Sequence, residues 1–119
     1  MISGINLSEQ TDYILPDDKE NPTVWKLGVI SSYIMGQLAE KGAETSKMDM
    51  MFKVAQLGIK GWTNLQGIEF KTVKDKMFGQ DVDVVPMEKL AKIPMPAISQ
   101  VALKILEINK IAPDEAKNS

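Results

Sequence analysis

The strongest constraint on the fold is the apolar pattern that follows Pro96. Between residues 96 and 110 apolar side chains recur at helical spacing, which predicts a helix that starts at Pro96 and stops before Pro113. The members of its main face are Ile98, Val101, Ala102, Ile105 and Leu106. Leu103 and Ile108 widen this face beyond what one core requires. We therefore expect a second surface to cover it, in a partner or in another copy of the chain.

Two earlier segments show the same helical spacing. Residues 30–41 predict a helix with Gly42 as its C-cap. The apolar stripe of this helix consists of Ile30, Tyr33, Ile34 and Leu38. A second helix should begin after Ser46, a favourable N-cap, and should end at Gly58 and Gly61. The apolar stripe of the second helix consists of Met48, Met51, Phe52, Ala55 and Ile59.

Alternating residues predict two hairpins. Residues 11–15 and 23–29 should pair across the acidic turn that separates them, with the face that carries Trp25 buried. A strand is predicted over residues 68–74, where apolar and polar side chains alternate. Residues 81–85 alternate again, so this segment should pair with the preceding strand in a second hairpin.

These elements predict an α+β fold, a helix-dominated small domain with an N-terminal β-hairpin, a second short hairpin and three to four helices. A short helix over 87–92, opened by Pro86, completes the set. We expect a single domain over 1–119, with residues 1–10 as a flexible arm and 113–119 as a polar tail.

The composition argues against several classes of function. Histidine and cysteine are both absent, so the usual general base, thiolate nucleophile and commonest metal ligands are missing. All fourteen basic residues are lysines and the net charge is −2, which argues against nucleic-acid recognition because arginine and a positive field are its usual means. We therefore expect no enzyme, no cofactor, no metal and no nucleic-acid partner.

No apolar run is long enough to cross a bilayer, and the first residues do not resemble a signal peptide. The expectation is therefore a cytoplasmic protein without a membrane partner. The absence of cysteine fits a reducing compartment.

The segment GIKGWTNLQGIEF, residues 58–70, allows two interpretations. Gly58 and Gly61 form a GxxG, which in KH domains clamps a nucleic-acid backbone between two helices. No helical pattern follows Gly61, so a structural corner is the better interpretation. In that case the glycines supply left-handed backbone at the helix end and Trp62 folds over the core.

Two acidic groups are weak site candidates. Asp17, Asp18 and Glu20 lack the spacing of a calcium loop. Asp81 and Asp83 share one face of a predicted strand, where carboxylates that face water are commoner than an acid–base pair. Loss of a measurable activity on changing both aspartates would be needed to revive the enzyme hypothesis.

Methionine is the residue type whose excess in this chain gives a hint of function. Methionine side chains adapt to irregular partners and are common at binding surfaces, although core packing is their usual role. Met50 lies off the main stripe of its helix, so it is the preferred candidate for an exposed contact. The full set of candidate partner-binding residues is Met48, Met50, Met51, Trp62, Leu103 and Ile108.

Three stretches together resemble a phage protein family. They are PDDKENPTVWKLGVI near the start, GIKGWTNLQGIEFKT in the middle and IPMPAISQVALKILEINKIAPDEAKNS at the end. In this order they resemble tail assembly chaperones of tailed phages, small proteins of the structural gene cluster. The resemblance implies a protein that coats the tape-measure protein in the host cell cytoplasm, assists assembly of the tail-tube protein, and then leaves. It also implies self-association. The alternative is a permanent virion component of the tail or head–tail junction.

Overall fold

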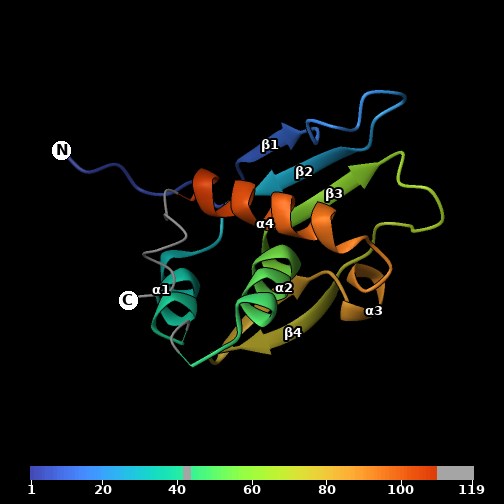
Figure 1. The fold of residues 1–119 in the computed structure, drawn as a ribbon. Coiled ribbons are helices and arrows are strands. Elements are labelled where there is room, and N and C mark those ends of the chain that lie inside the picture. Colours follow the sequence, from blue (N-terminus) through green and yellow to red (C-terminus); the bar gives the residue numbers. More distant parts are fainter. Residues whose placement is uncertain (42–43, 110–119) are drawn as a thin grey trace.

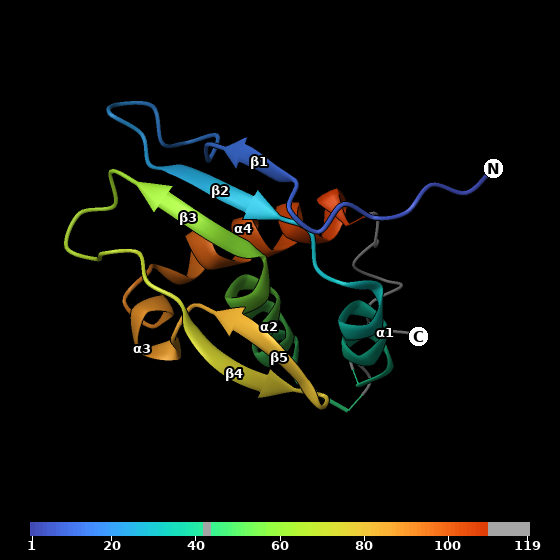
Figure 2. The same cartoon turned by 180° about the vertical axis from the view of Figure 1, so that it is seen from behind.

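Strands form one layer of the fold and two long helices form the other. A computed structural model describes residues 1–41 and 44–109 of the chain. Opposite views place one helix across a three-stranded sheet and a second helix across a two-stranded sheet (Figures 1 and 2). The α+β class, the two hairpins and the helices predicted from the sequence are confirmed.

The first sheet has strand order β1-β2-β3 and is antiparallel throughout. Its strands are β1 (Gln10–Tyr13), β2 (Val24–Gly28) and β3 (Ile59–Thr63). β1 and β2 form the predicted N-terminal hairpin. Trp25 and Leu27 are buried, so the predicted inner face of β2 is confirmed. Both side chains lie beneath the helix that crosses this sheet, which ties the hairpin to the core.

The sequence prediction missed β3. Residues 58–61 were expected to end a helix in left-handed backbone, but neither Gly58 nor Gly61 has a positive φ angle. The helix ends at Gly58 and the strand starts at once with Ile59. Trp62 does fold into the core, where its indole Nε1 donates a hydrogen bond to the Ile68 carbonyl at 2.9 Å.

The second sheet is the hairpin of β4 (Val73–Met77) and β5 (Gln80–Val84). β5 was predicted correctly, but the strand predicted over 68–74 is wrong, because only its last two residues belong to β4. The alternation of Ile68 and Phe70 has another cause. Phe70 packs edge-on against Trp62 with ring centroids 4.9 Å apart, so these apolar side chains belong to a loop that covers the tryptophan.

The helices begin and end close to their predicted bounds. They are α1 (Ser32–Lys41), α2 (Lys47–Gly58), α3 (Met87–Leu90) and α4 (Met95–Ile108). The Ser46 side chain accepts a hydrogen bond from the Asp49 backbone, which confirms this N-cap. The predicted cap Gly42 and the predicted tail 113–119 lie outside the described residues. Residues 1–9 contain no strand or helix and are exposed, in line with an arm.

Two predicted stripes are partly wrong. In the first stripe Ile30, Ile34 and Leu38 are buried as predicted, but Tyr33 is 53% exposed. On α2 the buried face is displaced from the predicted one and consists of Val54, Ala55, Leu57 and Gly58. Met48 lies at the exposed first turn, before α2 meets the rest of the core.

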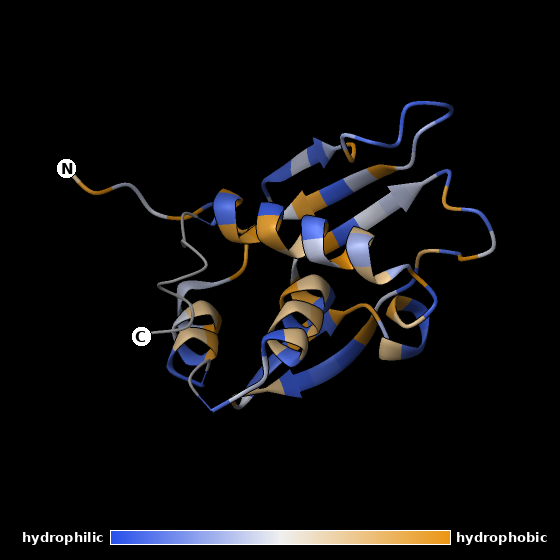
Figure 3. Ribbon diagram, viewed as in Figure 1, coloured by the Kyte–Doolittle hydropathy of each residue, from blue (hydrophilic) through white to orange (hydrophobic). Residues whose placement is uncertain are grey.

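The main apolar face of α4 is covered inside the protein. All five residues predicted for its main face are buried. The helix packs against β2 on one side and against α2 on the other, so it needs two apolar flanks (Figure 3). Of the two residues that widen this face, Leu103 is 41% exposed and Ile108 is half-buried, so an external cover for that part stays a prediction.

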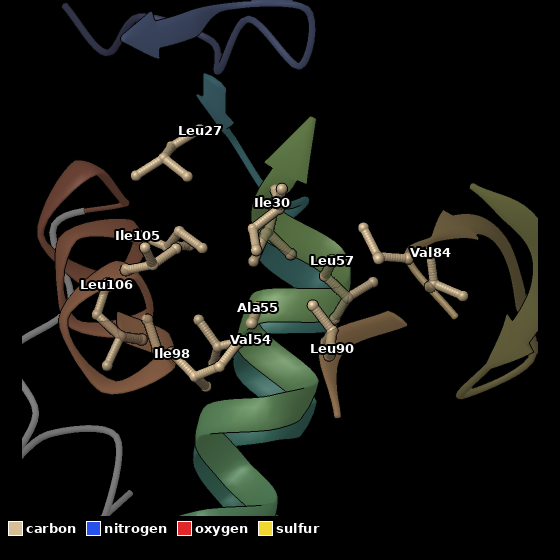
Figure 4. Close-up of a cluster of buried hydrophobic side chains, with 14 of the residues drawn as sticks. Leu27, Ile30, Val54, Ala55, Leu57, Val84, Leu90, Ile98, Ile105 and Leu106 are labelled. Atoms are coloured by element: carbon tan, nitrogen blue, oxygen red, sulfur yellow. The ribbon is translucent and has the colours of Figure 1, made fainter. Parts of the chain in front are cut away.

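Gly58 sets how closely α2 and α4 approach. A Cβ atom at Gly58 would lie 2.4 Å from Cγ2 of Ile105 on α4, so a larger residue cannot fit without movement. Figure 4 shows Ile105 directed toward α2 beside Val54 and Ala55. Leu90 and Val84 lie on the far side of α2, which is therefore buried between α4 and the second hairpin.

Candidate functional site

Exposed apolar side chains concentrate on the N-terminal arm, residues 1–9. Among the described residues eleven large hydrophobic side chains are exposed, and four of them lie here: Met1, Ile2, Ile5 and Leu7. The arm leaves β1 and extends away from the body in both views (Figures 1 and 2). Two hollows border the part of the arm nearest the body, and both have Ile30 in their lining.

The smaller hollow lies between the arm and α1, and we call it the α1 hollow. Its volume is about 230 Å³ and its lining is mostly apolar. The lining residues are Ile5, Ile30, Ser32, Met35, Gly36, Ala39 and Asn109. A Cβ atom at Gly36 would meet nothing within 4 Å, so this glycine leaves room in the hollow. Tyr33 lies on the same helix and is exposed, although it is not one of the lining residues.

Asn109 fixes the end of this hollow. Its side-chain oxygen accepts a hydrogen bond from the Ile30 backbone at 2.9 Å, and its amide donates to the Ile105 carbonyl at 2.8 Å. One side chain thus ends α4 and joins it to the segment between β2 and α1. The link crosses 79 residues of sequence, so no local pattern could have indicated it.

The larger hollow lies between the two sheets, and we call it the Lys60 cleft. Its volume is about 390 Å³, which is within the usual size range of small binding sites. Apolar side chains from the β2–α1 connection and from α2 line one part. Polar side chains from β3 and β5 line the other part. The lining residues are Leu7, Val29, Ile30, Ser31, Ile34, Leu57, Lys60, Gln80, Asp81, Val82 and Asp83.

A β-bulge places Lys60 at the cleft. Ile59 pairs with Leu27 and Gly61 pairs with Lys26, so Lys60 is an extra residue without a partner on β2. Bulges turn side chains out of the regular alternation. The stem of Lys60 then lies over Gly28, where a Cβ atom would be 2.6 Å from Lys60 Cγ. Gly28 is therefore needed to let the lysine cross β2.

The charged amine of Lys60 is partly buried. Burial lowers the pKa of its amine from the usual 10.5, and the charge of Asp83 opposes this with a smaller effect. Within residues 1–41 and 44–109 no carboxylate lies within ion-pair distance of the Lys60 amine. Asp83 instead pairs with Lys74 at 3.1 Å, and Asp81 lies 3.9 Å from Lys76. Among the residues that the structure describes, the cleft thus has one cationic lining residue, and it lacks a close counter-ion.

The sequence-predicted contact residues do not form one surface. Met48 and Leu103 are exposed, on the first turn of α2 and on α4 respectively. Met50 was preferred as an exposed contact, but it is half-buried and packs against the core, because the inward face of α2 is displaced. Met51 and Ile108 are half-buried in the same way. Trp62 is buried, so it cannot meet a partner while the core is closed.

A third, shallow hollow of about 160 Å³ adjoins Leu103, between α4 and β1. The Lys104 amine lies over the Tyr13 ring there, 5.6 Å from its centroid. Asp81 and Asp83 lie on the exposed face of the hairpin, as predicted, and each faces a lysine rather than the other aspartate.

In the part of the chain that the structure describes, no group of three or more acidic side chains could hold a metal ion. No helix in the described ranges is long and apolar enough to cross a membrane. What the two hollows offer is apolar surface beside a few hydrogen-bonding groups, which suits the binding of another polypeptide.

Comparisons with known proteins add no assignment. No family model, curated protein sequence or solved structure matches this chain significantly. The two hollows are therefore candidate sites on the basis of their geometry alone.

Proposed function

We propose that this protein is a phage tail assembly chaperone that acts in the host cell cytoplasm. It binds the tape-measure protein, keeps that protein's apolar surface covered, and assists assembly of tail-tube subunits through protein–protein contacts without catalysis. The three stretches that resemble this family support the proposal, and so does a composition without histidine or cysteine.

The observation that carries the binding role is the α1 hollow, together with the exposed Tyr33 on the same helix. A helical partner places apolar side chains at every third or fourth position into a groove of this kind. The hollow of about 230 Å³ accepts one such side chain, and Tyr33 supplies aromatic area for the next. Aromatic residues are frequent anchors of protein interfaces.

Binding is tested by co-purification of the tape-measure protein with variants of this chain. Gly36→Leu places a side chain at the hollow, and its Cβ meets nothing within 4 Å. We expect it to reduce co-purification about tenfold, as the loss of one buried anchor does. Gly36→Ala is the matched control, because a methyl group is too small to fill the hollow. Equal co-purification with both variants would remove the hollow from the proposal.

The transient role is tested by mass spectrometry of mature virions beside the infected-cell lysate. A chaperone that acts and then leaves is present in the lysate and absent from the virion. Stoichiometric presence in the virion would overturn the chaperone assignment and favour a permanent component of the tail or head–tail junction.

A further inference from the structure

The outer edge of β5 is free along the Lys60 cleft. β4 and β5 are joined by a two-residue turn, Phe78-Gly79, in which both residues have positive φ angles. In such a hairpin the residues that flank the turn, Met77 and Gln80, form a hydrogen-bonded pair, and the pairs then alternate. Lys76↔Asp81 and Lys74↔Asp83 are therefore the pairs without mutual hydrogen bonds.

This alternation turns the backbone groups of Asp81 and Asp83 away from β4. Both residues line the Lys60 cleft. Among the described residues no backbone hydrogen bond from another segment reaches their N–H or C=O groups. An unpaired strand edge is a template for an added strand. The cleft thus combines a free edge, apolar lining and the Lys60 cation.

The N-terminal arm has the chemistry that this edge requires. In an extended conformation Ile5, Leu7 and Glu9 point to one side, two apolar groups followed by the single carboxylate of residues 1–9. Leu7 already touches the Lys60 cleft of its own chain, so the cleft accepts this side chain. It remains 56% exposed there, which leaves most of its apolar area uncovered.

The arm cannot pair with the edge of its own β5 in this extended form. Gln10 is held in β1 opposite Gly28. Immediately before it the chain folds into a turn, since Ser8 donates from its backbone and hydroxyl to the Asn6 side chain, and Glu9 donates to the Asn6 carbonyl. In a second copy the same turn must open, but Gln10 of that copy is not tied to β1 of the accepting molecule, so the opened arm can align with the edge of β5.

We propose that the edge of β5 takes the N-terminal arm of a second copy of the chain, with Ile5 and Leu7 in the Lys60 cleft and Glu9 beside Lys60. The arm adds a third strand to the β4–β5 sheet. Each copy donates one arm and accepts another at a different place, so the contact is head-to-tail and can propagate along a filament. The inference rests on the proposed function only for the assumption that copies assemble.

The test is the association of the full chain, measured by analytical ultracentrifugation over a range of concentrations. We expect concentration-dependent oligomers for the full chain and a monomer after deletion of residues 1–8, which lie outside every strand. Glu9→Lys places like charges together and should weaken association about tenfold. Glu44→Lys, an equal change of net charge at an exposed position outside the arm and the cleft, should have no effect.

A charge exchange identifies the partner groups. Lys60→Glu alone should weaken association as Glu9→Lys does, and the double variant should regain it. An equal mixture of the two single variants should also associate, because the arm of the Glu9→Lys chain meets the cleft of the Lys60→Glu chain. That result requires the arm and the cleft to come from different molecules.

A full chain that stays monomeric, or a deletion variant that associates as strongly as the full chain, would overturn the inference. So would a double variant no better than the single ones. These outcomes do not affect the proposed function, because it is tested separately. Tape-measure binding is tested by co-purification with Gly36→Leu, and the transient role is tested by mass spectrometry of virions. Loss of tape-measure binding would equally leave the arm exchange standing.

Discussion

The contact between Gly58 and Ile105 allows a quantitative test of how the core is built. In Gly58→Ala the new Cβ would lie 2.4, 2.7 and 2.9 Å from Cγ2, Cδ1 and Cγ1 of Ile105. Carbon atoms in contact prefer about 3.5–4.0 Å. Ile105 is fully buried and cannot turn into solvent, so α2 and α4 must separate or Ile105 must leave its rotamer.

The expected cost follows from two opposed effects. Overpacking of a dense core costs about 1–3 kcal/mol, and three close contacts to one immobile side chain favour the upper part of that range. Alanine favours a helix over glycine by about 0.5–1 kcal/mol. The free energy of unfolding should therefore fall by about 1–2 kcal/mol, which lowers the Tm by several degrees for a chain of this size.

The measurement is urea unfolding followed by the fluorescence of the two buried tryptophans, Trp25 and Trp62. Gly36→Ala is the matched control, because its Cβ meets open space in the middle of α1 and should raise stability by about 0.5–1 kcal/mol. If Gly58→Ala were as stable as the wild type, with the same slope of unfolding free energy against urea concentration, then α2 and α4 would not be packed as closely as described.

Two further predictions concern polar groups. Burial lowers the pKa of Lys60 in the folded protein below its usual 10.5. Between the lowered pKa and 10.5 the unfolded chain binds more protons than the folded one, so the free energy of unfolding rises with pH. Lys60→Met should thus unfold at a higher urea concentration than the wild type at pH 7. The difference between the two urea midpoints should shrink as the pH rises toward 10.5, and a difference that stays constant with pH would contradict this. Asn109→Ala leaves the Ile30 backbone N–H without its acceptor and should cost about 1–3 kcal/mol in thermal or urea unfolding, whereas a neutral effect would mean that water replaces the amide.

The sequence predicted those elements whose pattern reflects one dominant contact. The buried face of α4 was correct because the sheet and α2 together enclose every apolar position of its main stripe. The inner face of β2 was correct for the same reason, since Trp25 and Leu27 have only one side on which to be buried. In such segments the spacing of the apolar residues along the sequence matches the repeat of the helix or strand that they form.

The errors come from residues whose role depends on distant partners. Gly58 does end α2, but Gly61, which was expected at the same helix end, lies in β3 because this segment pairs with β2. Ile68 and Phe70 resemble a strand, but Trp62 organises them as a loop. Tertiary contacts override weak local preferences in both places.

The candidate site was the least predictable part. The position of Lys60 results from a bulge, from the absence of a side chain at Gly28, and from a hairpin that follows some twenty residues later. None of these is visible in the GIKG segment itself. A lysine between two glycines was a weak signal, and only the pairing of β2 with β3 turns it into a cleft residue.

The position of α4 in the fold has a consequence for how the protein is made. This helix follows every strand in the sequence, yet it fills the space between the first sheet and α2. While the ribosome is still adding residues up to Pro94, Trp25, Leu27 and Val54 have no helix to cover them. Domains usually fold as units, so folding of this one waits until α4 has left the exit tunnel. A nascent chain halted before Ile98 should therefore be sensitive to proteases, and a chain long enough for α4 to leave the tunnel should be resistant.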